Sequence, residues 1–150
     1  MMPPAMEDPL GRHPISLAIP VLWGDMDANL HVNNVVYARW IESARVAYFE
    51  RIGLPVPPGK DGIGPIVARL AIDYGRTLSY PDTVHVSATV RAIGRTSLTL
   101  GYRVRSAAQE AVVAEGEDVV VLLDYRDGRK VPVDDALRAK FLALEAQGQG

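Results

Sequence analysis

The chain has 150 residues, a formal net charge of −2 and no cysteine. This length is typical of one domain, and a domain of this size buries enough surface to fold without disulfides. The lack of cysteine excludes disulfides, thiolate metal sites and a thiol nucleophile. Lysine and arginine total 16 against 18 acidic residues and are dispersed along the chain, which does not indicate a nucleic-acid-binding protein.

Residues 1–14 are rich in proline and are expected to form a loosely ordered tail. This segment lacks the basic start and apolar run of a signal peptide. No stretch of the chain approaches the roughly 18 consecutive apolar residues that a membrane-spanning helix needs. We therefore expect a cytoplasmic protein without membrane association, with a single domain over residues 15–146.

An apolar run at residues 15–23 predicts a first strand, and a polar loop follows it. A helix is predicted over residues 34–52, since Asn33 or Asn34 is a suitable N-cap and Gly53 a suitable end. Most positions of this helix are apolar, which indicates that other elements surround it on several sides.

The second half of the chain has the pattern of strands. Runs rich in valine, isoleucine, threonine and tyrosine predict strands at 66–74, 83–93, 97–106 and 112–124, with a short one at 130–133. Asp134 or Asp135 caps a short final helix that ends near Glu145. Because helices do not alternate with strands, the fold class is α+β: a long helix wrapped by a curved antiparallel sheet of about five strands.

Three segments carry a resemblance to a known family: Trp23-Gly24-Asp25-Met26-Asp27, then His31-Val32-Asn33-Asn34-Val35-Val36-Tyr37, then Glu42-Ser43-Ala44-Arg45. With the segments at 72–74, 79–84 and 93–97, they resemble 4-hydroxybenzoyl-CoA-thioesterase-like proteins of the hotdog fold. The resemblance covers about residues 19–133. It implies an acyl-CoA thioesterase that needs no cofactor. In one departure, many relatives carry glycine where Leu30 stands.

Thioester hydrolysis needs an activated water or an attacking carboxylate, and a site that stabilises the developing oxyanion. The free N–H groups at a helix start can supply that site. Asp27 lies seven residues before the expected helix start. The resemblance implies that Asp27 is the catalytic base or nucleophile and that an N–H near Asn34 is the oxyanion donor. By local sequence alone, an Asp-x-Asp loop is more often turn chemistry, the role expected for Asp25.

Four further residues are candidates for substrate binding: His31, Asn33, Tyr37 and Glu42. The simpler alternatives are a hydrogen-bonding loop residue for His31, a helix cap for Asn33 and a core position for Tyr37. Glu42 is expected to pair with Arg45 one turn further on. It is also the alternative catalytic carboxylate, because another branch of hotdog thioesterases uses a glutamate on the helix.

A CoA substrate carries phosphates, which bind basic and hydroxyl groups. Arg95, Thr96 and Ser97 form a turn that resembles a family position in contact with CoA, and Arg76 and Arg91 are weaker candidates. The histidines are scattered and there is no His-Glu-x-x-His motif, so no metal site is predicted.

A small curved sheet has an edge strand with unpaired backbone N–H and C=O groups. Pairing of this strand between two chains satisfies those groups. We expect a homodimer or homotetramer whose active site, as in the resembling family, lies at the interface. Two other functions stay open: a non-catalytic acyl-CoA-binding module and an enoyl-CoA hydratase or dehydratase. The segment at 27–31 begins like the hydratase motif Asp-x-Asn-Pro-x-His, but it lacks the proline and is one residue short.

Overall fold

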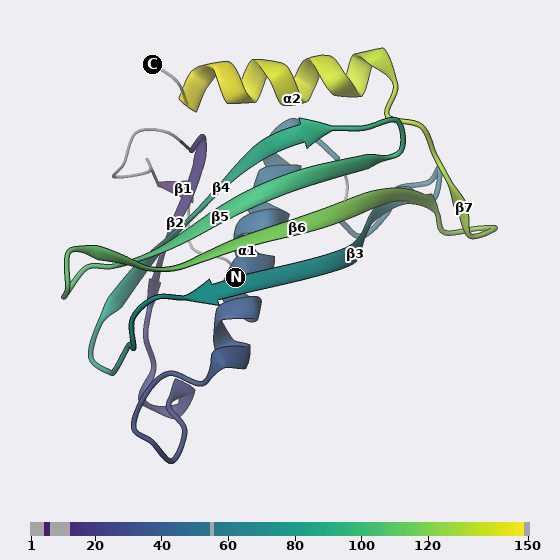
Figure 1. Ribbon diagram of the computed structural model, residues 1–150. Coiled ribbons are helices and arrows are strands. Elements are labelled where there is room, and N and C mark those ends of the chain that lie inside the picture. The colour runs from purple at the N-terminus through teal and green to yellow at the C-terminus, as the bar shows by residue number, and fades with distance from the viewer. Residues whose placement is uncertain (1–4, 7–12, 55, 149–150) are drawn as a thin grey trace.

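The computed structural model describes residues 5–6, 13–54 and 56–148. Figure 1 shows a long helix, α1 (Asn34–Ile52), against one face of a twisted sheet, with a second helix, α2 (Asp135–Gly148), packed beside β4 and α1. Within the described residues, no helix is both long and apolar enough to cross a membrane. Most of the tail expected at 1–14 lies outside the described residues.

The sheet is antiparallel throughout and has the order β1-β2-β4-β5-β6-β3, with β7 paired to β6. Its strands are β1 (Ala5–Met6), β2 (Ile15–Pro20), β3 (Ile63–Tyr74), β4 (Thr83–Ile93), β5 (Ser97–Ser106), β6 (Ala111–Asp124) and β7 (Arg129–Lys130). Five of them are long, as the sequence predicts, and β1 and β7 have two residues each. The α+β hotdog architecture is thereby confirmed.

Both ends of α1 fall where the sequence predicts. The Asn33 side chain accepts the N–H of Val35 at 3.1 Å, and Gly53 ends the helix with a φ of 78°. A left-handed residue at this position favours glycine, because it carries no Cβ. The core lies between α1 and the sheet, where large side chains such as Ile41 and Tyr48 are fully buried. Burial on several sides explains why α1 is apolar over most of its surface.

Several strands differ from their predicted bounds. β2 ends at Pro20, three residues before the predicted end, and β7 covers Arg129–Lys130 and not 130–133. β3 begins at Ile63, three residues early, although it then includes Pro65. Proline has no backbone N–H to donate to a neighbouring strand. An edge strand such as β3 has a neighbour on one side only, so it tolerates this loss. Residues Ala5–Met6, predicted as part of a loose tail, pair instead with Ser16 and Leu17 of β2.

A buried ion pair joins α1 to the middle of the sheet. Arg45 donates from Nε to Asp118 Oδ2 at 2.7 Å, and the Tyr102 hydroxyl donates to the same oxygen at 2.7 Å. The expected pair between Glu42 and Arg45 is therefore wrong, because Arg45 turns inward while Glu42 is exposed. Burial raises the pKa of Asp118, and the opposing effect of Arg45 is smaller. Since a buried charge needs a partner, this contact fixes where α1 lies on the sheet.

The outer face of the sheet carries a second set of ion pairs. Arg91 of β4 passes over Gly101 of β5 and reaches Glu117 of β6, with Nη1 3.1 Å from Oε2. A Cβ on residue 101 would overlap the Arg91 guanidinium. Because Gly101 has no side chain, it provides the space in which the Arg91 side chain crosses β5.

Candidate active site

The loop between β2 and α1 folds back on itself. Its first part is a 3-10 turn, η1 (Trp23–Asp25), in which Asp25 Oδ2 accepts the N–H of Leu22 at 2.8 Å. The Asp25 carbonyl accepts the N–H of Asn33 at 2.9 Å, and Met26 and Val32 form an antiparallel bridge. Asp25 thus anchors the loop, which is the role that the sequence predicts for it.

Asp27 lies in a tight turn inside this loop. Its N–H donates to the His31 carbonyl at 2.9 Å, and its Oδ1 accepts the N–H of Asn29 at 2.9 Å. Leu30, in the same turn, has a φ of 61°. This is the left-handed region that glycine adopts most easily, which explains why glycine suits this position in relatives.

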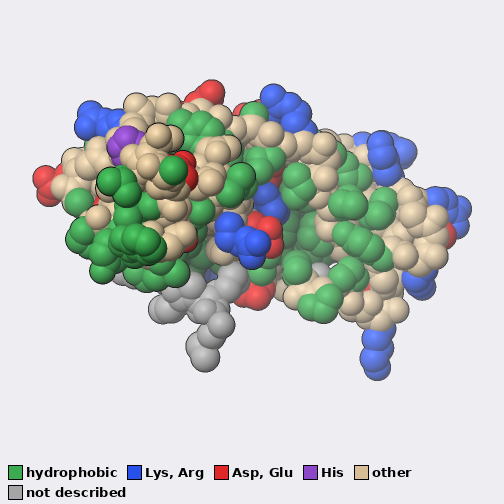
Figure 2. Space-filling view, turned by 90° about the horizontal axis from the view of Figure 1, so that it is seen from below, with side chains coloured by type: hydrophobic (Ala, Val, Ile, Leu, Met, Phe, Trp, Pro, Cys, Tyr) green, Lys and Arg blue, Asp and Glu red, His purple; other side chains and the backbone are tan. Residues whose placement is uncertain are grey.

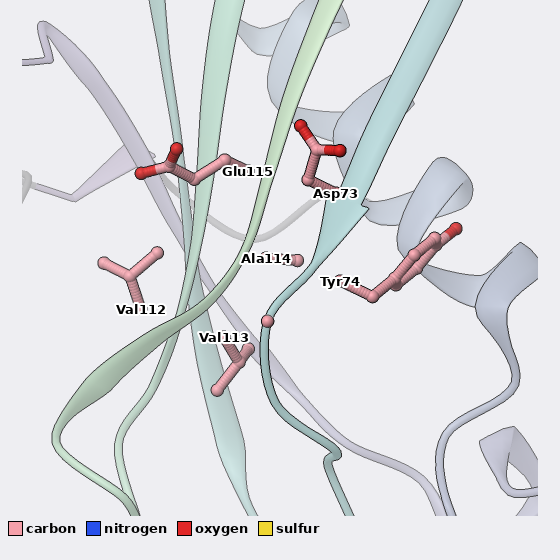
Figure 3. Close-up of a pocket in the computed structure, with 7 residues that line it drawn as sticks. Asp73, Tyr74, Val112, Val113, Ala114 and Glu115 are labelled. Atoms are coloured by element: carbon pink, nitrogen blue, oxygen red, sulfur yellow. The ribbon is translucent and has the colours of Figure 1, made fainter.

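The first turn of α1 is tied to the end of the edge strand. The Tyr74 hydroxyl donates to the Asn34 carbonyl at 3.0 Å. Figure 3 shows the Tyr74 side chain turning from β3 toward α1, away from Glu115. Asn33 accepts the N–H groups of Val35 and Val36, so among the first residues of α1 the N–H of Asn34 is the one without an acceptor in the described part of the chain.

A pocket of about 230 Å³ lies at this helix start. Its lining residues are His31, Val32, Asn34, Tyr37, Tyr74, Gly75, Arg76 and Thr77. The pocket unites three of the predicted site residues with the segment 74–77, which follows β3. Sequence reasoning missed Tyr74 and Thr77, and named Arg76 only as a weak CoA-binding candidate. No local pattern indicates that residues so far apart share one cavity.

Tyr37 forms the inner wall of the pocket. It is 3% exposed, and its ring meets that of Tyr74 edge-on, with centroids 5.0 Å apart. The Trp40 ring also packs against it, with a centroid distance of 5.2 Å. Burial and the nearby Tyr74 hydroxyl raise the pKa of Tyr37 to about 12. The Tyr37 phenol is therefore a neutral hydrogen-bond donor at neutral pH.

A second pocket, of about 280 Å³, adjoins the first and shares Tyr74 and Gly75 with it. Asp73 of β3 and Glu115 of β6 stand directly opposite each other in the sheet register and line this second pocket. In Figure 3 their carboxylates project from the neighbouring strands, while Tyr74 points elsewhere. Acidic groups therefore lie on the far side of Tyr74 from the helix start.

The other predicted residues lie outside the first pocket. Asp27 and Asn33 belong to the adjoining loop and cap, and Glu42 is exposed eight residues beyond Asn34, about 12 Å along α1.

The proposed CoA-binding residues Arg95, Thr96 and Ser97 lie at the opposite end of the strands, as Figure 1 shows for the β4–β5 turn. In the sheet register, Val104 of β5 pairs with Ala114 of β6, which in turn pairs with Tyr74 of β3. Ser97 lies seven residues from Val104 along β5, so it is about 23 Å from the row of residues that contains Tyr74. The backbone of this turn is fixed, because the Thr96 carbonyl accepts the N–H of Leu122 at 3.1 Å. Within one chain, this turn and the pocket are far apart.

The surface around the loop is apolar. Four large side chains there are more than half exposed: Leu22, Trp23, Leu30 and Val35. Figure 2, which views the molecule from below, shows hydrophobic side chains gathered on the side of this loop. Among the residues that the structure describes, no group of three or more histidine, aspartate or glutamate side chains is placed to hold a metal ion.

Comparison with known proteins identifies the family. Residues 21–141 match the model of the thioesterase-like superfamily. No curated protein matches the chain. Among solved structures, the PA2801 protein of Pseudomonas aeruginosa, an inferred thioesterase, is 34% identical, with 85% of this chain and 96% of that chain covered and a TM-score of 0.76.

A thioesterase from Thermus thermophilus, solved with coenzyme A and Zn, is 32% identical, with 90% of this chain and 96% of that chain covered and a TM-score of 0.80. The BH1999 gentisyl-coenzyme A thioesterase is 21% identical at a TM-score of 0.73, with 84% of this chain and 98% of that chain covered, and so shares the fold. The chain belongs to the thioesterase-like superfamily, and it is a thioester hydrolase of the hotdog fold.

Proposed function

We propose that the protein hydrolyses a small-to-medium or aromatic acyl-CoA thioester to a free acid and CoA. The observation that carries this proposal is the pocket at the start of α1, in which Asn34, His31 and Tyr37 meet. A thioester carbonyl held against the helix start receives the backbone N–H of Asn34 and the positive end of the helix dipole. These groups stabilise the negative charge that develops on the carbonyl oxygen.

Asp27 is the proposed catalytic carboxylate, as base or nucleophile. Its backbone N–H is bonded to His31, a residue of the pocket wall, so the turn that carries Asp27 adjoins the pocket. Only Asp27 Oδ1 is used by the turn, through Asn29; within the described residues Oδ2 accepts no hydrogen bond. A carboxylate held in this way retains an oxygen for water or for the thioester carbon.

The Asp27→Asn variant tests this role. We expect thiol release from a panel of acyl-CoA thioesters, acetyl to palmitoyl and benzoyl, to fall about 100-fold or more with the fold intact. Glu50→Gln, an exposed carboxylate near the end of α1, is the matched control and should keep its activity, and Glu42→Gln tests the alternative carboxylate. Normal turnover in Asp27→Asn with loss in Glu42→Gln would transfer the role to Glu42. Acyl-CoA binding by the folded wild type without thiol release would favour a binding module.

We further propose a dimer in which β3 pairs with its copy. β3 is an edge strand, and Ile66, Val67 and Leu70 on it are 42%, 40% and 36% exposed. A two-fold axis beside β3 extends the sheet and covers this edge. In such an antiparallel pair the strands of the second subunit run in the opposite direction. The turn at 95–97 of one subunit therefore lies on the same side of the dimer as the helix start of the other. Arg95, Thr96 and Ser97 are then the proposed contacts to CoA across the interface.

Ile66→Lys tests the dimer, since a charge on an edge strand opposes pairing. Sedimentation is expected to show a smaller assembly than the wild type, together with a loss of thiol release. Leu142→Lys, a change of the same kind at an exposed position on α2, should leave both unchanged. An active wild-type monomer would disprove the interface.

A further inference from the structure

The pocket at the start of α1 has one permanently charged side chain in its lining, Arg76, beside several groups that can donate hydrogen bonds. Arg76 carries five N–H donors, and the backbone N–H of Asn34 at the helix start is a further donor. None of the residues that line this pocket has a carboxylate side chain. A ligand that fits such a lining supplies acceptors, and a full negative charge suits it best.

Two of these donors have no protein partner. Within the described residues, neither the Arg76 guanidinium nor the Tyr37 hydroxyl forms a hydrogen bond or an ion pair. Tyr37 is 3% exposed as a whole residue, but its unpaired hydroxyl is not fully buried and is open to the pocket that the side chain lines. An unpaired donor that is open to a pocket is available to a ligand that supplies an acceptor. The backbone of Arg76 is fixed, because its N–H donates to the Val113 carbonyl at 3.0 Å.

The position of the pocket indicates which part of the substrate carries the charge. Asn34 belongs to this pocket, and the proposed function places the thioester carbonyl beside Asn34. The whole pantetheine arm separates the phosphates of CoA from the thioester sulfur. An anion beside both Arg76 and the helix start therefore belongs to the acyl group.

The size of the pocket limits that acyl group. Its volume of about 230 Å³ corresponds to that of roughly eight water molecules. This suits a short acyl chain with a terminal carboxylate. Asp73 and Glu115, on the other side of Tyr74, oppose an anion beyond the pocket.

We propose that the enzyme selects short acyl groups that end in a carboxylate, the mono-CoA thioesters of short dicarboxylic acids. Arg76 pairs with the terminal carboxylate, and Tyr37 donates a hydrogen bond to it. This inference rests on the proposed function and names the substrate class of that same site. Hydrolysis adds water across the thioester, so the products are the dicarboxylic acid and CoA.

Matched substrate pairs test the proposal. Succinyl-CoA and butyryl-CoA, or glutaryl-CoA and valeryl-CoA, differ at the chain end by a carboxylate, and kcat/KM is measured for each after subtraction of the rate without enzyme. We expect the wild type to prefer the carboxylate member by about 10-fold or more. Arg76→Gln should abolish this preference and Tyr37→Phe should reduce it. Arg51→Gln, an exposed arginine in the last turn of α1, is the control and should retain it.

Each other outcome has a defined meaning. Thiol release without a preference in the wild type overturns the inference and leaves the proposed function standing. An equal loss on both members of a pair in Arg76→Gln places Arg76 on the phosphates of CoA and also overturns it. If no thioester is hydrolysed, the proposed function fails, and calorimetric binding of the same pairs decides. Tighter binding of the carboxylate member, lost in Arg76→Gln, supports the inference, and equal binding overturns it.

Discussion

The turn that carries Asp27 contains a strained residue. Leu30 has a φ of 61°, in the left-handed region. Its side chain is 65% exposed, so it buries little apolar surface that could offset the strain. An L-residue in the left-handed region costs about 1–2 kcal/mol relative to a right-handed one. The turn is held in place from outside, since the Ser79 hydroxyl donates to the Leu30 carbonyl at 2.9 Å.

Leu30→Gly is expected to stabilise the protein by about 0.5–1 kcal/mol. Glycine removes the strain but increases the entropy of the unfolded chain, so the gain is smaller than the strain itself. Urea unfolding measures the change. Leu30→Ala, which removes the side chain but keeps the Cβ, should show no gain. A destabilised glycine variant would mean that the exposed leucine makes a favourable contact in the assembled protein.

One carboxylate of the C-terminal helix contacts the domain at three points. Glu145 of α2 accepts hydrogen bonds from the Tyr48 hydroxyl at 2.6 Å, the Thr89 hydroxyl at 2.7 Å and the N–H of Val90. The register of β4 and β5 shifts just after Val90, at the place where its N–H turns to Glu145. Phe141 completes the contact, with its ring stacked 6.0 Å from that of Tyr48. A bulge in β4 therefore forms part of the docking site for α2.

Glu145→Ala is expected to destabilise the protein by about 2–3 kcal/mol, because it leaves the buried Tyr48 hydroxyl without an acceptor. Glu145→Gln keeps one acceptor oxygen and should cost less. Urea unfolding with circular dichroism provides the measurement. A change in Glu145→Ala of less than about 0.5 kcal/mol, the usual size for a surface substitution, would show that the apolar face of α2 and the hydrogen bonds of Arg138 hold the helix without Glu145.

The elements with local signals were predictable from sequence. The bounds of α1 follow from the cap Asn33 and from Gly53, and the bounds of β4 and β5 from the turns beside them. The pocket was not predictable as a unit, because residues 31–37 and 74–77 meet only through the tertiary fold. The partner of Arg45 was missed for the same reason: Asp118 is 73 positions away, whereas Glu42 satisfied the local spacing rule.

For the molecule as a whole, three buried tyrosines link stability to alkaline pH. Burial raises the pKa of Tyr37 to about 12, and burial raises the pKa values of Tyr48 and Tyr102 further still, with added effects from Glu145 and Asp118. In the unfolded chain a tyrosine has a pKa of about 10. Above that pH the unfolded state has lost protons that the folded state retains, so the free energy of unfolding falls as pH rises.

We expect stability to be independent of these tyrosines below about pH 10 and to decline above it, by up to about 1.4 kcal/mol per pH unit for each tyrosine. Urea midpoints measured over this range give the slope. Tyr37→Phe, which removes one of the three phenols, should make the decline shallower by about a third up to pH 12. A stability that stays flat to pH 12 would contradict the prediction.

The path of Arg91 over Gly101 makes two positions on neighbouring strands depend on each other. Any side chain at position 101 displaces the Arg91 guanidinium from Glu117. A substitution of Gly101 therefore removes the ion pair between Arg91 and Glu117 even when Arg91 is still present. Substitutions at 91 and 101 are consequently non-additive, and the second to occur has a smaller effect than it would have alone. In the divergence of related sequences, this epistasis makes a non-glycine residue at 101 easier to accept after the arginine has been replaced.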